Sequence, residues 1–219
     1  FREANITTSL RSPHIVRVYD VGRMDNGVPY IVMELLNGKS LATILREREQ
    51  LSIHEARRML AEIGVGLTSA HQVGIVHRDL KPPNLFLTDA QEGRPPIWKL
   101  LDFGVARRRE SNETLTKARV IGTPAYMAPE LFSAEAASPA TDLYALGCVL
   151  FQMLTGDPPF DGPNFLELAD AHRESPVPPL SDAVPPALAK VIRRCLAKDP
   201  ESRPESAAWV RELLLGVLE

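Results

Sequence analysis

The sequence predicts an α+β fold with two lobes, a small one made of one helix and a strand hairpin and a larger one that is mostly helical. Two short apolar runs, at 15–21 and 30–33, are separated by Gly, Asn and Pro residues that favour tight turns. From Ser40 onwards, apolar residues recur at three- and four-residue spacing, which is typical of amphipathic helices. A chain of 219 residues is long enough for one large domain or two small ones.

Composition and charge favour an ordinary globular protein. The chain is 44% hydrophobic and 24% charged, and its net charge of −3 gives no reason to expect nucleic acid as a partner. No apolar run reaches the roughly 20 residues that a membrane-spanning helix needs, so we expect no membrane segment in this chain. Cys148 and Cys195 each lie in an apolar helical pattern, which favours buried free thiols over a disulfide and indicates a reducing, cytoplasmic compartment.

The first part of the chain is expected to form the small lobe. Phe1–Leu10 has apolar residues at helical spacing but no capping residue, as if a helix had been entered partway, and Pro13 would end it. The two apolar runs are expected to pair as an antiparallel hairpin. Gly38 is expected to break the chain before the helical region begins.

The remaining elements follow from local patterns. Ser52, with Glu55 three residues later, is typical of a capping box, in which the two side chains satisfy free backbone N–H groups at the start of a helix. Two short strands, 85–87 and 98–101, flank a polar loop that contains Gly and Pro. Helices are expected where apolar residues recur at helical spacing, at 41–48, 54–73, 141–154, 164–172, 185–197 and 205–215.

The most specific chemical signal is the run His77-Arg78-Asp79-Leu80-Lys81-Pro82-Pro83-Asn84. In this loop Asp79 could accept a hydroxyl proton, Lys81 could neutralise a phosphate, and Asn84 could hold a divalent metal ion. Asp102-Phe103-Gly104 begins 18 residues after Asn84, and Ala128-Pro129-Glu130 begins 26 residues after Asp102. A single triplet occurs often by chance, whereas all three motifs in this order and spacing form a specific signal.

Together these motifs resemble the signature of the Ser/Thr protein kinases, particularly the bacterial eukaryotic-like kind. The resemblance implies a protein kinase-like two-lobe fold, with 1–36 as a remnant of the small lobe. The range 37–219 would be the large lobe, with the catalytic loop, the activation segment and the peptide-binding helices. The implied activity is transfer of the γ-phosphate of ATP to Ser or Thr hydroxyls of protein substrates. Lys81, Gly122-Thr123 and Ala128-Pro129-Glu130 resemble a Ser/Thr kinase more than a tyrosine or small-molecule kinase.

The resemblance also assigns roles to single residues. Asp79 would be the catalytic base, Lys81 would contact the γ-phosphate, and Asn84 and Asp102 would hold Mg²⁺, with Mn²⁺ as an alternative. Met33 resembles the gatekeeper beside the adenine site, and the hinge would follow it. The implied nucleotide-binding residues are Met33, Glu34, Leu36, Lys81, Asn84, Phe86 and Asp102. Two plainer interpretations stay open: Asp79 and Asn84 could only cap their loop, and Met33 could be an ordinary core methionine.

Further matches concern structure and control. Glu130 resembles the family's buried ion-pair partner of an arginine, here Arg203, and Asp142 resembles the helix residue that binds the backbone of the catalytic loop. Arg78 resembles the arginine that pairs with a phosphate on the activation loop. The expected phosphorylation sites are Thr114 and Thr116, ahead of Ser111. Autophosphorylation there would involve self-association of the kinase.

The resemblance fails at the start of the chain. The sequence contains no G-x-G-x-x-G motif and no strand lysine of the kind that pairs with a helix glutamate, and Glu3 resembles that glutamate without its partner. We therefore expect a fragment that is inactive alone, from a parent that could carry a membrane anchor elsewhere. Two other classes are a degenerate kinase acting as a scaffold and a small-molecule kinase. The intact catalytic positions argue against the first, and Ala128-Pro129-Glu130 argues against the second.

Overall fold

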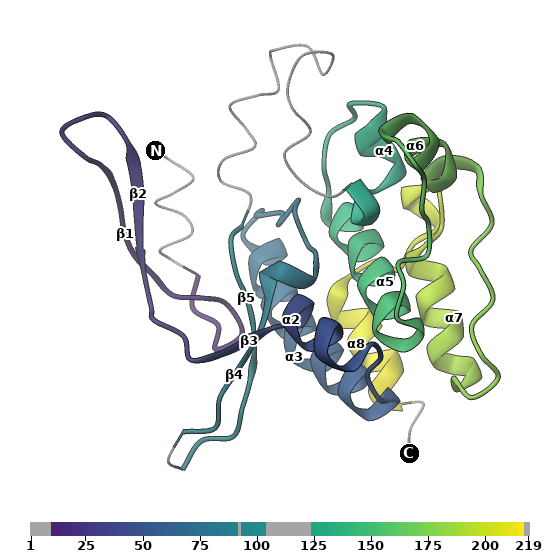
Figure 1. Ribbon diagram of the computed structural model, residues 1–219, viewed down its shortest axis with the longest axis horizontal. Coiled ribbons are helices and arrows are strands. Elements are labelled where there is room, and N and C mark those ends of the chain that lie inside the picture. The colour runs from purple at the N-terminus through teal and green to yellow at the C-terminus, as the bar shows by residue number, and fades with distance from the viewer. Residues whose placement is uncertain (1–9, 92, 104–123, 217–219) are drawn as a thin grey trace.

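The computed structural model describes residues 10–91, 93–103 and 124–216, which combine small sheets with a helical lobe (Figure 1). The strand hairpin projects to one side, a second sheet lies between it and the helices, and the helices fill the other side. The predicted α+β class is confirmed for this part of the chain. The helix expected at Phe1–Leu10 lies outside the described residues, apart from Leu10.

The described strands form two antiparallel sheets. The predicted hairpin is confirmed and consists of β1 (Val18–Arg23) and β2 (Pro29–Met33), with Val21 opposite Ile31. The second sheet has the order β3-β4-β5 and consists of β3 (Gly38–Ser40), β4 (Leu85–Thr88) and β5 (Trp98–Leu100). Because β4 and β5 are antiparallel, β5 returns the chain to the end of the sheet where η1 leads into β4.

The start of the first predicted strand was wrong. Ile15 and Val16 do not belong to the hairpin; they are buried, and the backbone N–H of Val16 donates to the Leu100 carbonyl at 2.9 Å. Ile15 forms a parallel bridge with Leu100. This pairing to a distant strand buries both apolar side chains, so β1 begins only at Val18, where exposed and half-buried residues take over.

The predicted break at Gly38 was also wrong, because Gly38 is the first residue of β3. Its φ of +143° is a conformation that residues with an L side chain rarely adopt, and a Cβ there would overlap the Leu87 carbonyl oxygen. Glycine is thus needed for close pairing of β3 with β4, in which Ser40 lies opposite Phe86.

The predicted helices are confirmed to within two residues at each end. The capping box at Ser52 and Glu55 is present: the Glu55 N–H donates to Ser52 Oγ, and the Ser52 N–H donates to Glu55 Oε2 at 2.9 Å. Within the described ranges, a short α4 and three 3₁₀ turns were not predicted. The α-helices are α2 (Leu41–Arg48), α3 (Ile53–Gln72), α4 (Pro129–Phe132), α5 (Pro139–Thr155), α6 (Phe165–Glu174), α7 (Pro186–Cys195) and α8 (Ala207–Gly216). The 3₁₀ turns are η1 (Pro82–Asn84), η3 (Pro124–Tyr126) and η4 (Pro200–Ser202).

Helix α5 lies at the centre of the core, with most of its side chains buried between α3 and α7. A Cβ at Gly147 would lie 2.8 Å from the Cβ of Cys195, so a glycine there lets α7 approach closely. Cys148 and Cys195 are free and buried, as predicted, and burial raises the pKa of both thiols, that of Cys195 to about 12. Among the described helices, none is long and apolar enough to cross a membrane.

Candidate active site

The backbone at the start of the loop 77–84 is held by a buried carboxylate on α5. Asp142 is 1% exposed, and its oxygens accept the backbone N–H groups of His77 at 2.8 Å and Arg78 at 2.9 Å. His71 Nε2 donates to the same carboxylate at 2.8 Å. The backbone of Arg78 has a φ of +66°, a conformation that costs free energy in a non-glycine residue and that these bonds hold in place. The predicted role of Asp142 thus agrees with its contacts.

His77 connects this loop to the segment after β5. Its ring is buried, Nε2 donates to the Leu101 carbonyl at 2.8 Å, and the ring lies 4.7 Å from that of Phe103. Burial lowers the pKa of His77, so the imidazole is neutral and its Nδ1 can accept the Asp79 N–H, which is 3.4 Å away. The sequence placed His77 in the motif but gave no sign of these contacts, which depend on the tertiary fold.

Three predicted catalytic residues are brought together. Lys81 Nζ lies 2.8 Å from Asp79 Oδ2, and both side chains are about a quarter exposed, at 21% and 26%. The Asn84 amide nitrogen donates to the Asp79 carbonyl at 2.8 Å and to Asp79 Oδ2 at 3.2 Å. The turn η1, which starts with Pro82, folds Asn84 back toward Asp79. An acceptor, a cation and an amide thus share one partly exposed site.

Asp102 approaches from the neighbouring segment. Its side chain is exposed, and its backbone has a φ of +44°. Leu101, the residue before it, donates its N–H to the Asn84 carbonyl at 2.9 Å, so the two predicted metal ligands lie on adjoining stretches of chain. Phe103, after Asp102, is buried, which fixes the chain on both sides of the carboxylate.

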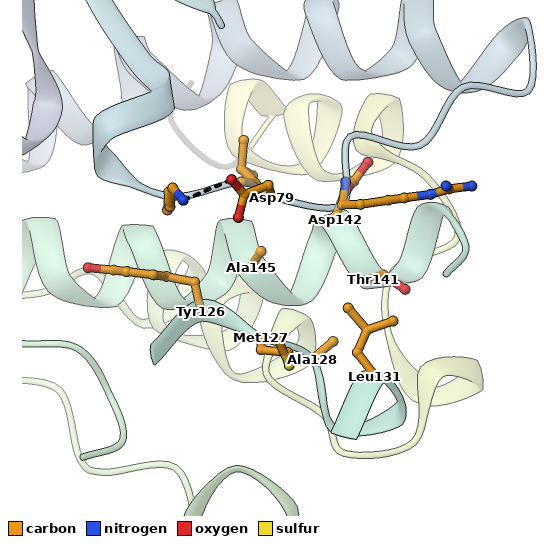
Figure 2. Close-up of a pocket in the computed structure, with 11 residues that line it drawn as sticks. Asp79, Tyr126, Met127, Ala128, Leu131, Thr141, Asp142 and Ala145 are labelled. Carbon is orange, nitrogen blue, oxygen red and sulfur yellow. Dashed lines mark hydrogen bonds and ion pairs between the residues drawn. The ribbon is translucent and has the colours of Figure 1, made fainter. Parts of the chain in front are cut away.

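A small recess lies beside Asp79 (Figure 2). Asp79 and Lys81 line one wall, the segment Tyr126–Leu131 lines the other, and α5 contributes Thr141 and Ala145 at its base. The Tyr126 hydroxyl donates to Gln152 Oε1 at 2.6 Å. Burial raises the pKa of Tyr126 to about 12, so it remains a neutral donor. The Asp79 carboxylate therefore borders the recess.

The wall formed by Tyr126–Leu131 is held by a buried ion pair at Glu130. Arg203 donates to both Glu130 oxygens, at 2.8 and 2.7 Å, and Thr141 Oγ1 donates to Glu130 Oε1 at 2.9 Å. Burial acts to raise the pKa of Glu130, but the Arg203 bonds and charge outweigh it, so the pKa is lowered. The pair predicted from the sequence is therefore present in the structure.

The predicted nucleotide-binding residues lie in several elements. Phe86 lies on β4 opposite Lys99, and Leu36 precedes β3 by two residues. Met33 ends β2 and is 39% exposed, so its interpretation as a core methionine was wrong. Glu34 Oε1 lies 2.6 Å from Lys99 Nζ, an ion pair that the sequence did not suggest.

Several predicted positions lie outside the described residues: Glu3, Gly104, Ser111, Thr114, Thr116 and Gly122-Thr123. Among the described residues there is no group of three or more His, Cys, Asp or Glu side chains that could hold a metal ion. A site that takes one carboxylate and one amide oxygen from the protein, and the rest from phosphates and water, is compatible with this finding.

Comparison with known proteins gives consistent matches. The protein kinase domain family matches residues 1–214. Serine/threonine-protein kinase PknB of Mycolicibacterium smegmatis is 39% identical over 226 residues, which cover 100% of this chain and 35% of that protein. PknB of Mycobacterium leprae is 37% identical over 223 residues, with 99% and 35% covered. The probable serine/threonine-protein kinase pknA2 of Bifidobacterium longum is 36% identical over 216 residues, with 97% and 28% covered. The chain thus spans about a third of the length of these relatives.

Proposed function

Because the chain belongs to the protein kinase family, we propose that the protein containing it is a Ser/Thr protein kinase that transfers the γ-phosphate of ATP to hydroxyls of protein substrates. The observation that carries the proposal is the shared site of Asp79, Lys81 and Asn84, with Asp102 on the adjoining segment. Within this proposal, residues 1–36 belong to the small lobe and 37–219 form the large lobe.

The chain's own residues supply position and charge. Asp79 accepts a hydrogen bond from the substrate hydroxyl and takes its proton as the hydroxyl oxygen bonds to the γ-phosphorus. The bond from that phosphorus to the β,γ-bridging oxygen breaks, and ADP carries away the electron pair. Lys81, whose Nζ is already 2.8 Å from Asp79, places a cation next to the transferring phosphoryl group.

The donor set fits a hard divalent cation, Mg²⁺ or Mn²⁺. The Asn84 amide nitrogen is used on Asp79, which leaves the amide oxygen as the metal-binding atom, and the Asp102 carboxylate is exposed. The bound ion would neutralise charge on the phosphates. Met33, Glu34, Leu36 and Phe86 are proposed to bind the adenine end of ATP.

A protein substrate is favoured by the recess beside Asp79. The second wall of this recess is the chain segment Tyr126–Leu131, and the Glu130–Arg203 pair holds that segment in place. Such a surface can take an extended peptide with one hydroxyl directed at Asp79. A kinase region in the cytoplasm, where ATP and reducing conditions occur, agrees with two free buried thiols.

Control by phosphorylation is the second part of the proposal. Phosphate on Thr114 or Thr116 would add charge that Arg78, beside the catalytic base, can pair with, and transfer between two associated copies would place it there. Mass spectrometry of the full-length kinase after incubation with ATP should find these phosphates. Full activity in the double variant Thr114→Ala, Thr116→Ala would contradict this switch.

The central test is phosphate transfer by the full-length protein. We expect Mg²⁺-dependent transfer of radiolabel from ATP to a protein substrate, with phosphoserine or phosphothreonine as the product. Asp79→Asn and Asp102→Ala should abolish transfer, while Asp182→Asn, at an exposed loop carboxylate, serves as the matched control and should leave it unchanged. Transfer at the wild-type rate by Asp79→Asn, or a mainly phosphotyrosine product, would refute the proposal.

A further inference from the structure

We propose that Lys99 is a positioning residue for nucleotide binding, which acts by fixing the Glu34 carboxylate and, through it, residues 34–36. The inference rests on the proposed function, in which those residues bind adenine. Lys99 lies in β5, three residues before Asp102, and it belongs to none of the sequence motifs. The following contacts carry the inference.

The Lys99–Glu34 pair is short and partly buried. Lys99 Nζ lies 2.6 Å from Glu34 Oε1, and the two side chains are only 12% and 23% exposed. The lysine pair in the adjacent part of the same sheet, Lys39–Glu47, is 2.7 Å long but 55% and 49% exposed. Exposed pairs are screened by water and salt and contribute little, whereas a partly buried pair holds its geometry.

Glu34 is also tied to the backbone. Its Oε1 accepts the Arg17 N–H at 2.8 Å, and its own N–H donates to the Arg17 carbonyl at 2.9 Å. One residue earlier, Val16 donates to the Leu100 carbonyl of β5 at 2.9 Å. One carboxylate oxygen of Glu34 thus contacts both the Arg17 backbone and the Lys99 ammonium group. Glu34 is therefore connected to β5 directly through Lys99, and indirectly through the segment 16–17, which bonds to Leu100.

The position of Lys99 explains how the pair affects nucleotide binding. Lys99 lies directly opposite Phe86 in the β4–β5 register, and directly opposed residues share a sheet face. Phe86 is a proposed adenine contact, and Asp102 a proposed metal ligand farther along the same chain. The Lys99–Glu34 pair therefore links the proposed adenine-binding segment to the strand that leads to Asp102.

This role predicts a specific kinetic pattern. Residues 34–36 contact the part of ATP that does not react, so their displacement weakens binding of the ground state and the transition state equally. Loss of Lys99 should raise KM for ATP and leave kcat nearly unchanged. A merely structural role would lower the fraction of folded enzyme, which lowers kcat at constant KM.

The experiment compares variants of the full-length kinase by steady-state kinetics with varied ATP. Lys99→Met and Glu34→Gln should each raise KM about tenfold, the loss expected for one charge-assisted hydrogen bond, and leave kcat within about twofold. The double variant should resemble each single variant because both remove the same interaction. Lys99→Arg should recover most of the affinity, and Lys39→Met is the matched control with no change in KM.

Titration with a fluorescent ATP analogue, read in parallel, separates the two proposals. If the wild type binds the analogue and transfers no phosphate, the proposed function fails while the Lys99 proposal is still tested by the affinities. The Lys99 proposal is overturned if Lys99→Met keeps the wild-type KM and affinity, if only kcat falls, or if Lys39→Met shows the same loss.

Discussion

The strongest stability prediction concerns the buried guanidinium group of Arg203. Its side chain is fully buried, and its nitrogens donate to Glu130 through both carboxylate oxygens and to three backbone carbonyls, of Ala140, Ala197 and Lys198. Replacing Arg203 with Met leaves a shorter, unbranched apolar side chain and removes every donor. Glu130, which is 6% exposed, is then left without its cation.

The size of the expected loss in stability is set by Glu130, which stays in the core without its ion-pair partner. Removing one member of a buried ion pair costs about 3–5 kcal/mol because an uncompensated charge remains in the core. For a chain of this size that corresponds to a fall in Tm of about 10 °C. The wild-type pair lowers the pKa of Glu130, so its contribution is complete above the ordinary carboxyl pKa of 4.5 and is lost as the pH falls below that value. The cost of Arg203→Met should therefore shrink in acid.

Urea unfolding of the 219-residue chain, followed by fluorescence of its two tryptophans, measures this cost. Arg173→Met is the matched control, because Arg173 pairs with Asp170 at the surface, where the side chains are 41% and 64% exposed. It should change the free energy of unfolding by less than about 0.5 kcal/mol. A loss below about 1 kcal/mol for Arg203→Met, or a loss that does not depend on pH, would refute the reasoning.

Three further predictions concern other contacts. Burial lowers the pKa of His172 to about 4 from its usual 6.5, so between these values the unfolded chain binds a proton that the folded chain does not. Stability should fall as the pH drops through this range, and His172→Gln, which can still bond the Tyr144 hydroxyl, should make urea unfolding less dependent on pH. Ser52→Ala should cost about 1 kcal/mol, measured in the same way, and no loss would contradict the capping box. Asp142→Asn should lower kcat of the full-length kinase about 100-fold with unchanged circular dichroism, because even a 1 Å shift of the catalytic loop is costly; an unchanged kcat would refute the anchoring role.

Local patterns predicted the helices well. The spacing of apolar residues and the Ser52 cap are properties of neighbouring residues, so the sequence alone located α2 and α3 to within one residue. The strand errors had long-range causes. Ile15 joins the core through Leu100, which is distant in the chain, and Gly38 has no apolar neighbours to indicate a strand.

For the candidate site, too, the sequence predicted the local motif but not the long-range contacts. Asp79, Lys81, Asn84 and Asp102 were found because their order and spacing form a specific motif. The contacts that hold them were less visible: the His77 bond to Leu101 joins residues whose proximity only the fold creates. The metal and phosphate roles of the four residues remain proposals.

The two buried cysteines have a practical consequence for following the protein in solution. A thiol reagent can modify Cys148 or Cys195 only when the contact between α5 and α7 opens, because both sulfurs are buried and their raised pKa values leave little thiolate in the closed state. These two are the chain's only cysteines, so the rate of labelling in native buffer would report how often the contact between α5 and α7 opens, without any introduced probe. Nucleotide or peptide that slows this labelling would be stabilising the contact between α5 and α7.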